Sequence, residues 1–157
     1  MKSQTSPQDW PVDHDGLEVM PPKVCDELLA ASEVGRIAFI NAGAPLILPV
    51  NFRYHRGRIV FRTALGSKLN AAGRGYEVAF EIDDWDAPRR TGWSVLVRGT
   101  AEEVVSESEL EELFGLGLRP WADQIERSMW VQIHPRDISG RRIPSRKPLA
   151  SDDESAR

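Results

Sequence analysis

The chain has 157 residues, of which 41% are hydrophobic and 28% are charged, and this is the composition of one ordinary globular domain. Its formal net charge of −4, with basic residues dispersed among acidic ones, argues against a nucleic-acid-binding or membrane-surface protein. No stretch reaches the roughly 18–20 apolar residues of a membrane span, and the N-terminus lacks an apolar signal region. We therefore expect a soluble, cytoplasmic protein.

The chain divides into three predicted parts. Residues 1–16 are polar and have no hydrophobic period, so they are expected to form a flexible N-terminal arm. Residues 144–157 are polar and rich in Pro and Ser, so they are expected to form a disordered C-terminal tail. The folded domain is then residues 17–143.

A helix is predicted after Pro21–Pro22, because proline is tolerated in the first helical turn. Apolar residues then share one face at helical spacing, and they are Val24, Cys25, Leu28 and Leu29. Cys25 is the only cysteine, and its place on this inward face indicates a packing thiol. Residues 32–35 end the helix.

Three extended segments follow, at residues 35–40, 46–54 and 59–63, and short turns join them. Pro49 lies inside the second segment and favours a sheet edge or a bulge there, because proline cannot donate to the ladder. Residues 65–75 are predicted to form a loop that leads into a short helix.

Residues 76–86 and 92–105 are predicted as two further strands. The second has consecutive apolar residues at its centre, Val95–Val97. This pattern is typical of a strand that is buried on both faces, and it suits a barrel strand that also lies at a subunit contact.

Ser106 and Glu109 have the spacing of a capping box and predict the start of another helix. Residues 130–135 and 136–143 are predicted as a sixth strand and a short last strand. The strands are short, sequential and linked by hairpins, and this organisation indicates an antiparallel barrel.

The string FRTALGSKL, residues 61–69, resembles the pyridoxamine 5′-phosphate oxidase-like, FMN-binding split-barrel family. In that family a strand that ends in an aromatic residue and a Thr runs into a Ser/basic turn and a helix. The element order over residues 19–143 is similar too, and the segments EVGRIAFI, PLILPVNFRY and GWSVLVRGTAEEV look most like the nitroimidazole-reductase-type branch. The resemblance implies a mainly β, six-stranded antiparallel split barrel. It also implies a homodimer with two FMN sites at the interface.

The resemblance places the FMN phosphate at the turn after residue 63. Arg62 and Lys68 would supply positive charge, and Arg62 can bind two oxygens at once. Thr63 and Ser67 would supply hydroxyl donors, and Gly66 would let the backbone approach the anion. Taken without the resemblance, the same residues are also compatible with a solvated hairpin end.

The residues expected beside the flavin ring are Pro49, Val50, Asn51, Trp93, Ser94 and Arg141. Asn51 can form a hydrogen bond with the ring edge, or be a polar residue of an edge strand. By resemblance, Trp93 and Ser94 come from the partner chain, where Trp93 stacks on the ring or is simply an aromatic of the dimer core. Arg141 contacts the flavin or a negatively charged substrate, or belongs to the ordinary surface. No metal site is predicted, since the acidic residues 81–86 alternate across a strand.

With FMN the cofactor carries the reaction, and no side chain is recognisable as a catalytic acid or base. We expect an FMN-dependent oxidoreductase that acts on a small molecule. One alternative is a flavin-binding storage or sensing protein, and another is a deazaflavin-dependent reductase. Pyridoxamine 5′-phosphate oxidation itself is not expected, because the end of the chain reads ISGRRIPSRK where the true oxidase has its Arg–His substrate clamp.

Overall fold

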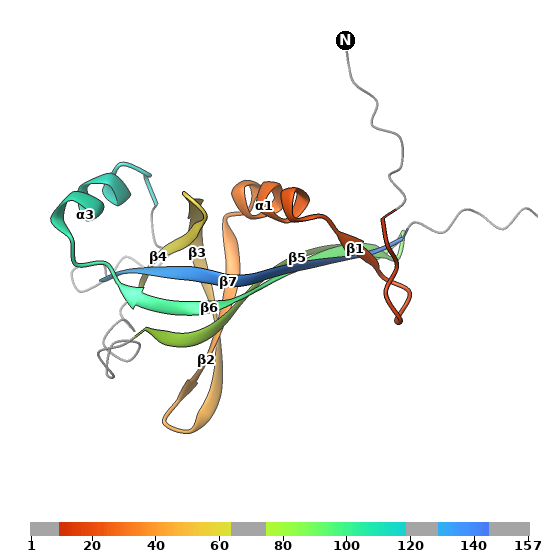
Figure 1. Cartoon of the computed structure of the whole chain (residues 1–157), viewed down its shortest axis with the longest axis horizontal. Helices are drawn as coiled ribbons and strands as arrows, with labels where there is room; N and C mark the ends of the chain where they lie inside the picture. The colour runs from red at the N-terminus through yellow and green to blue at the C-terminus, as the bar shows by residue number, and fades with distance from the viewer. Residues whose placement is uncertain (1–9, 64–74, 119–128, 145–157) are drawn as a thin grey trace, which may run out of the picture.

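The structure, a computed structural model, describes residues 10–63, 75–118 and 129–144 (Figure 1). Within these ranges the helices are α1 (Pro22–Ala31) and α3 (Glu107–Phe114). The strands are β1 (Glu18–Met20), β2 (Val34–Asn41), β3 (Ala44–His55), β4 (Arg58–Thr63), β5 (Tyr76–Asp86), β6 (Thr91–Glu103) and β7 (Met129–Ile143). None of the helices in the described ranges is long and apolar enough to cross a membrane.

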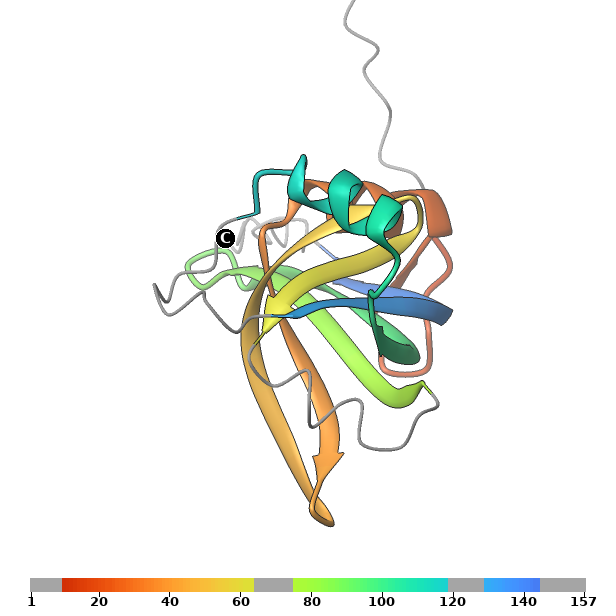
Figure 2. The same ribbon diagram turned by 90° about the vertical axis from the view of Figure 1, so that its left-hand side faces the viewer.

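Six of the strands form a closed antiparallel ring. Their order is β7-β4-β3-β2-β5-β6, and β6 pairs back onto β7. The seventh strand, β1, was not predicted, and it pairs with Gly140–Arg142 at the end of β7 that β4 does not reach. Figures 1 and 2 show both helices on one side of the ring, with the β2–β3 hairpin projecting on the other. The predicted six-stranded antiparallel barrel is confirmed, with β1 added outside the ring.

Inward-facing side chains that alternate along the strands fill the barrel. In β5, Val78, Phe80 and Ile82 are buried, while the residues between them are half-buried. The rings of Phe52 and Phe80 meet edge to face, with centroids 4.9 Å apart. Because a slip of one residue would turn this apolar set outward, the core fixes the register of the strands.

The two last predicted strands are a single strand, β7. Its ladder with β6 changes register between Arg98 and Gly99, and Pro135 pairs with Gly99 at this bulge. The bulge accommodates the proline that made the sequence look like two strands. A Cβ on Gly99 would lie 2.1 Å from the carbonyl oxygen of His134, so the close approach requires glycine.

The helix α1 begins at Pro22, as its prolines predicted, and it buries Cys25 and Leu29 against the barrel. The predicted capping box at the start of α3 is wrong. Ser106 makes no side-chain cap bond, and its hydroxyl lies 3.1 Å from that of Ser108. Glu109 instead accepts a hydrogen bond from Arg58 at 3.2 Å, because α3 packs beside the β3–β4 turn.

The residues before α1 cross the end of β7, and we call residues 10–20 the N-terminal strap. Asp13 accepts a hydrogen bond from Nε of Arg141 at 2.7 Å. The guanidinium of Arg142 lies 3.8 Å from the centre of the Trp10 ring and bonds the Glu18 carboxylate at 2.6 Å. Part of the segment expected to be an N-terminal arm thus makes specific contacts with the barrel.

Candidate functional site

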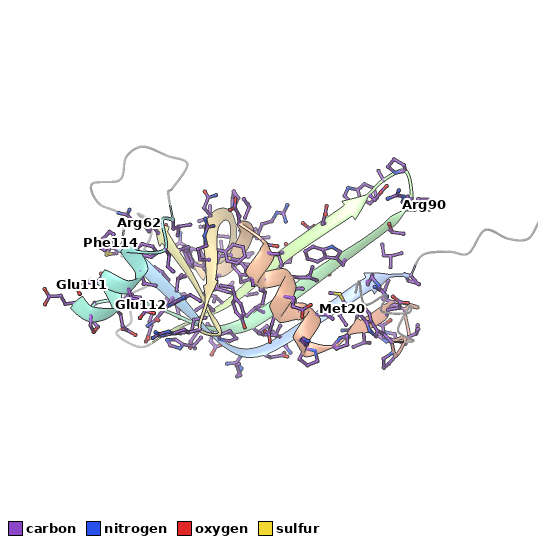
Figure 3. All side chains as sticks on the ribbon, turned by 90° about the horizontal axis from the view of Figure 1, so that it is seen from above. Met20, Arg62, Arg90, Glu111, Glu112 and Phe114 are labelled. Atoms are coloured by element: carbon purple, nitrogen blue, oxygen red, sulfur yellow. The ribbon has the colours of Figure 1, made fainter. Side chains whose placement is uncertain are left out.

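Arg62 lies between two aromatic rings at one end of the barrel. It belongs to β4 and pairs across the ladder with Trp130 of β7. Its guanidinium carbon is 5.6 Å from the ring centre of Trp130 and 5.6 Å from that of Phe114, the last residue of α3. Figure 3 shows Arg62 beside Phe114 at this end of the molecule. Three separate elements therefore meet at the arginine.

The donors at this position lack acceptors. Nε of Arg62 and Nε1 of Trp130 are both buried and form no hydrogen bond. No carboxylate of the described residues forms an ion pair with Arg62. A buried donor without an acceptor costs about 1–3 kcal/mol, and more when it is charged. Two such donors on neighbouring residues therefore fit a ligand with several acceptor oxygens, above all an anion.

The edge of β3 lies next to this arginine. β3 pairs with β4 only from Phe52 onward, so no described strand pairs with the Pro49 stretch on that side, in agreement with the predicted sheet edge. The β3–β4 ladder ends with the pair Phe52–Phe61. Asn51 and Arg62 are the next residues on the two strands beyond this pair. Pro49 and Asn51 face one side of the strand, whereas Val50 packs against the core.

The predicted phosphate turn is only partly described. Thr63 ends β4 opposite Met129, directly after Arg62. Gly66, Ser67 and Lys68 lie outside the described residues, so their predicted contacts with a phosphate remain predictions. The part of this motif that the structure does describe ends beside the two unpaired donors.

Trp93, Ser94 and Arg141 meet at a second place. Ser94 pairs with Arg141 across the β6–β7 ladder, while the neighbouring Trp93 faces the opposite side of the sheet. A cavity of about 270 Å³ lies here, lined by Leu17, Asp83, Asp84, Trp85, Gly92, Trp93, Ser94, Arg141, Arg142 and Ile143. The hydrogen bonds that Asp13 accepts from the Leu17 amide and from Arg141 hold the pKa of its carboxyl below the usual range.

The two places lie at opposite ends of the same strand. Arg62 pairs with Trp130, and Ser94 pairs with Arg141, which lies eleven positions further along β7. At about 3.3 Å per residue this is roughly 35 Å. Figure 3 shows Arg62 and Arg90, which lies in the β5–β6 turn, toward opposite ends of the molecule. One chain cannot bring all the predicted residues to one small ligand.

The outside of the β3-β2-β5-β6 sheet carries exposed apolar residues between charged ones. We call this the outer face, and its residues include Val34, Arg36, Ile47, Glu81 and Leu96. Leu96 is 41% exposed and Ile47 is 64% exposed. Val95 and Val97 are fully buried on the core side, and burial of the Leu96 side at a subunit contact stays a prediction. Clustered exposed apolar residues are typical of protein contacts.

Phe114, Trp130 and Asp13 were not among the predicted site residues. Phe114 and Trp130 each stand near an end of a predicted element, but their approach to Arg62 depends on the β4–β7 pairing. Asp13 was assigned to the N-terminal arm. The sequence sign of this residue's role is the turn-forming run DHDG, residues 13–16. In the structure the Asp13 side chain accepts hydrogen bonds from the backbone amides of Asp15 and Leu17.

The sequence model of the family described as Pyridoxamine 5′-phosphate oxidase matches residues 21–142. The chain belongs to this family. The resemblance noted for residues 61–69 and for the order of elements is thereby confirmed. The matched range begins at Pro21, after the N-terminal strap, so the contacts of Trp10, Asp13 and Glu18 lie outside it.

Relatives of known sequence or structure agree with this assignment. The uncharacterized protein Rv0080 of Mycobacterium tuberculosis is 41% identical over 121 residues, which cover 74% of this chain and 78% of that protein. A Corynebacterium glutamicum structure named for the same oxidase is 32% identical, with a TM-score of 0.71 over 81% of this chain and 98% of its own. The FAD binding protein from Mycobacterium smegmatis is 36% identical, with a TM-score of 0.66 over 80% of this chain and 99% of its own.

Proposed function

We propose that the protein is a flavoprotein that binds a flavin nucleotide between two copies of itself and acts as an oxidoreductase on a small molecule. The observation that carries the proposal is the pair of buried donors without acceptors, Nε of Arg62 and Nε1 of Trp130. Arg62 comes directly before residues 63–68 in the sequence, and Ser67 and Lys68 of that segment match the phosphate turn of the family. A flavin phosphate would supply the missing acceptor oxygens.

The distance within one chain supports a shared site. One subunit would supply Arg62 at the phosphate and Asn51 at the edge of the ring, and Trp93, Ser94 and Arg141 would come from the partner subunit. The exposed apolar residues of the outer face, such as Leu96, would be covered in such a homodimer. Each dimer would then hold two equivalent sites, as the two-fold symmetry of a homodimer requires.

FMN is the flavin that we propose first, because the predicted turn supplies groups for one phosphate. FAD is the second candidate, since the Mycobacterium smegmatis relative is described as an FAD binding protein. A bound flavin supplies hydride transfer, and the side chains of this protein bind and orient it. No described residue is assigned as a catalytic acid or base.

The test is the identity of the cofactor that copurifies. We expect yellow protein with flavin absorption bands, and FMN on release and mass analysis. Release of FAD would keep the flavoprotein assignment and change the nucleotide, and a bound deazaflavin would indicate a deazaflavin-dependent reductase. Colourless protein that takes up none of the three when they are added would contradict the proposal.

Turnover separates the enzyme from a storage or sensing protein. We expect NADH or NADPH to bleach the flavin bands and a small oxidant, such as a quinone, to restore them. If neither reductant bleaches a fully loaded protein, while FMN stays tightly bound, the oxidoreductase half of the proposal is wrong.

A further inference from the structure

The cavity near Arg141 has a mainly apolar lining, and its two tryptophans, Trp85 and Trp93, come from opposite faces of the β5–β6 ladder. Register places Trp85, Gly92 and Ile143 side by side on three neighbouring strands, at the end of the outer face. Gly92 has no side chain, and a Cβ there would lie 2.9 Å from Cβ of Trp85, so β5 and β6 approach each other closely at this pair. Trp85 is 70% exposed, which is unusual for so large an apolar side chain.

The volume limits what this cavity holds. It measures about 270 Å³, near the lower end of the roughly 300–1,000 Å³ found for small-molecule sites. A ligand of one or two fused rings fits this volume, and the exposed ring of Trp85 favours a flat aromatic one.

Both arginines of the cavity are already paired with carboxylates of the N-terminal strap. Nε of Arg141 donates to Asp13 at 2.7 Å, and Nε of Arg142 donates to Glu18 at 2.6 Å. The side chains of the two acids are only 16% and 18% exposed. Asp13 is also fixed by the Leu17 amide, so it cannot swing away from Arg141 without losing a second hydrogen bond.

The other charged residues of the lining are acidic. Asp83 forms an ion pair with Arg36, which also holds Glu81. Asp84 forms no ion pair with a described residue. An anion that enters the cavity therefore meets no uncompensated cation of the described lining, and it meets Asp84 as a like charge.

We propose that this cavity binds a flat, uncharged aromatic molecule, and that Asp13 sets the preference against anions by neutralising Arg141. The proposal concerns a residue that lies before the range matched by the family. It disfavours a phosphorylated substrate, such as the one for which the family is named. In a dimer of the proposed kind the ligand would lie beside the flavin ring bound by the partner, but the preference itself requires no flavin.

Two quinones with the same ring system test the preference. We would titrate the protein as purified with menadione, which is uncharged, and with 1,4-naphthoquinone-2-sulfonate, which carries one negative charge. Quenching of tryptophan fluorescence, checked by calorimetry, gives the two Kd values. We expect menadione to bind at least about tenfold more tightly than the sulfonate, and Trp85→Ala to weaken the binding of both.

Two substitutions should move the ratio of the two Kd values in opposite directions. Asp13→Asn frees the charge of Arg141. We expect it to lower the Kd of the sulfonate about tenfold and to change the Kd of menadione by less than about twofold. Arg141→Gln leaves the Asp13 charge uncompensated and is expected to weaken the sulfonate further. Asp15→Asn is the matched control in the same strap, because Asp15 is exposed and does not contact Arg141.

A loosened strap would change the Kd of both quinones in the same direction. Opposite shifts of the Kd ratio in Asp13→Asn and Arg141→Gln would therefore identify charge neutralisation. An unchanged ratio in both Asp13→Asn and Arg141→Gln would overturn the role of Asp13. Failure of menadione to bind flavin-loaded protein would show that the flavin ring itself occupies the cavity, and would overturn the proposal. Flavin content is a separate readout, so the flavoprotein assignment and the cavity assignment can fail independently.

Discussion

Arg62 combines two properties that together favour a bound anion. Its Nε is buried without an acceptor, and two aromatic rings flank its guanidinium. Cation–π contacts contribute roughly 0.5–2 kcal/mol, yet they do not replace the hydrogen bonds lost on burial. An anion that accepts from Arg62 would recover that cost, which is why we place the flavin phosphate there.

Replacing Arg62 by Ala should therefore weaken flavin binding at least tenfold. The reason is that a lost charged hydrogen bond costs about 1.5–3 kcal/mol, which corresponds to roughly 10–100-fold in Kd. Arg62→Lys keeps the charge but not the two-pronged geometry, so we expect an intermediate loss. Fluorescence titration of flavin into the cofactor-free protein measures both. Normal affinity in Arg62→Ala, with an unchanged melting temperature, would place the phosphate elsewhere.

Tyr54 gives a prediction about alkaline pH. Its hydroxyl donates to Asp26 of α1 at 2.8 Å, and burial, followed by that hydrogen bond, raises the pKa of Tyr54 from 10.0 to about 12. Between these values the unfolded chain loses a proton that the folded chain keeps. The stabilisation is therefore complete below about pH 10 and is lost as the pH rises toward 12.

We expect Tyr54→Phe to lower the free energy of unfolding at pH 8 by less than about 1 kcal/mol, since the bond is accessible to solvent. The difference from the original protein should shrink between pH 10 and 12, and urea unfolding at several pH values measures it. A difference that stays constant through pH 12 would mean that the Tyr54 phenol does not keep its proton in the folded protein.

At the scale of the elements, the sequence predicted the strands and helices of the barrel well, because their apolar residues alternate or recur clearly. Prediction from the sequence failed where pairing between distant segments determines the length or the existence of a strand. Pro135 looked like the end of a strand, and only the bulge opposite Gly99 allows β7 to continue. β1 has three residues, too few for a recognisable pattern, and exists because Glu18–Met20 pairs with β7.

Gly99→Ala tests the bulge. Its Cβ would lie 2.1 Å from the backbone oxygen of His134, and a backbone atom in a paired strand cannot move aside as a flexible side chain would. We expect a loss of roughly 1–3 kcal/mol in the free energy of unfolding. Chemical denaturation measures it, and a loss below about 0.5 kcal/mol would mean that β6 and β7 are not held in this register.

At the scale of the whole molecule, the sequence named residues that one chain keeps roughly 35 Å apart along β7. The motif from Arg62 to Lys68 is local, so it could be recognised from sequence. The contribution that we propose for Ser94 and Arg141 would depend on how two copies meet, and no periodicity within one chain encodes that. Trp130 was missed for a similar reason, since its contact with Arg62 arises only when the barrel closes.

The outer face provides a test of the proposed dimer. Leu96→Asp would place a carboxylate directly opposite Glu81, where an apolar contact between copies is expected. We expect a monomer in sedimentation experiments, with low flavin content. Val105→Asp is the matched control, because Val105 is 76% exposed but lies after the end of β6. A Leu96→Asp protein that remains a flavin-loaded dimer would exclude the outer face as the contact.

Mixing two defective subunits tests most directly whether two copies share one flavin site. Arg62→Ala removes the phosphate contact from one side of each site, and Ser94→Trp blocks the side contributed by the partner. Either homodimer should hold little flavin, whereas a heterodimer isolated with two different affinity tags regains one intact site and should hold one flavin per dimer. A heterodimer as poor in flavin as its two parents would contradict a site built from both copies.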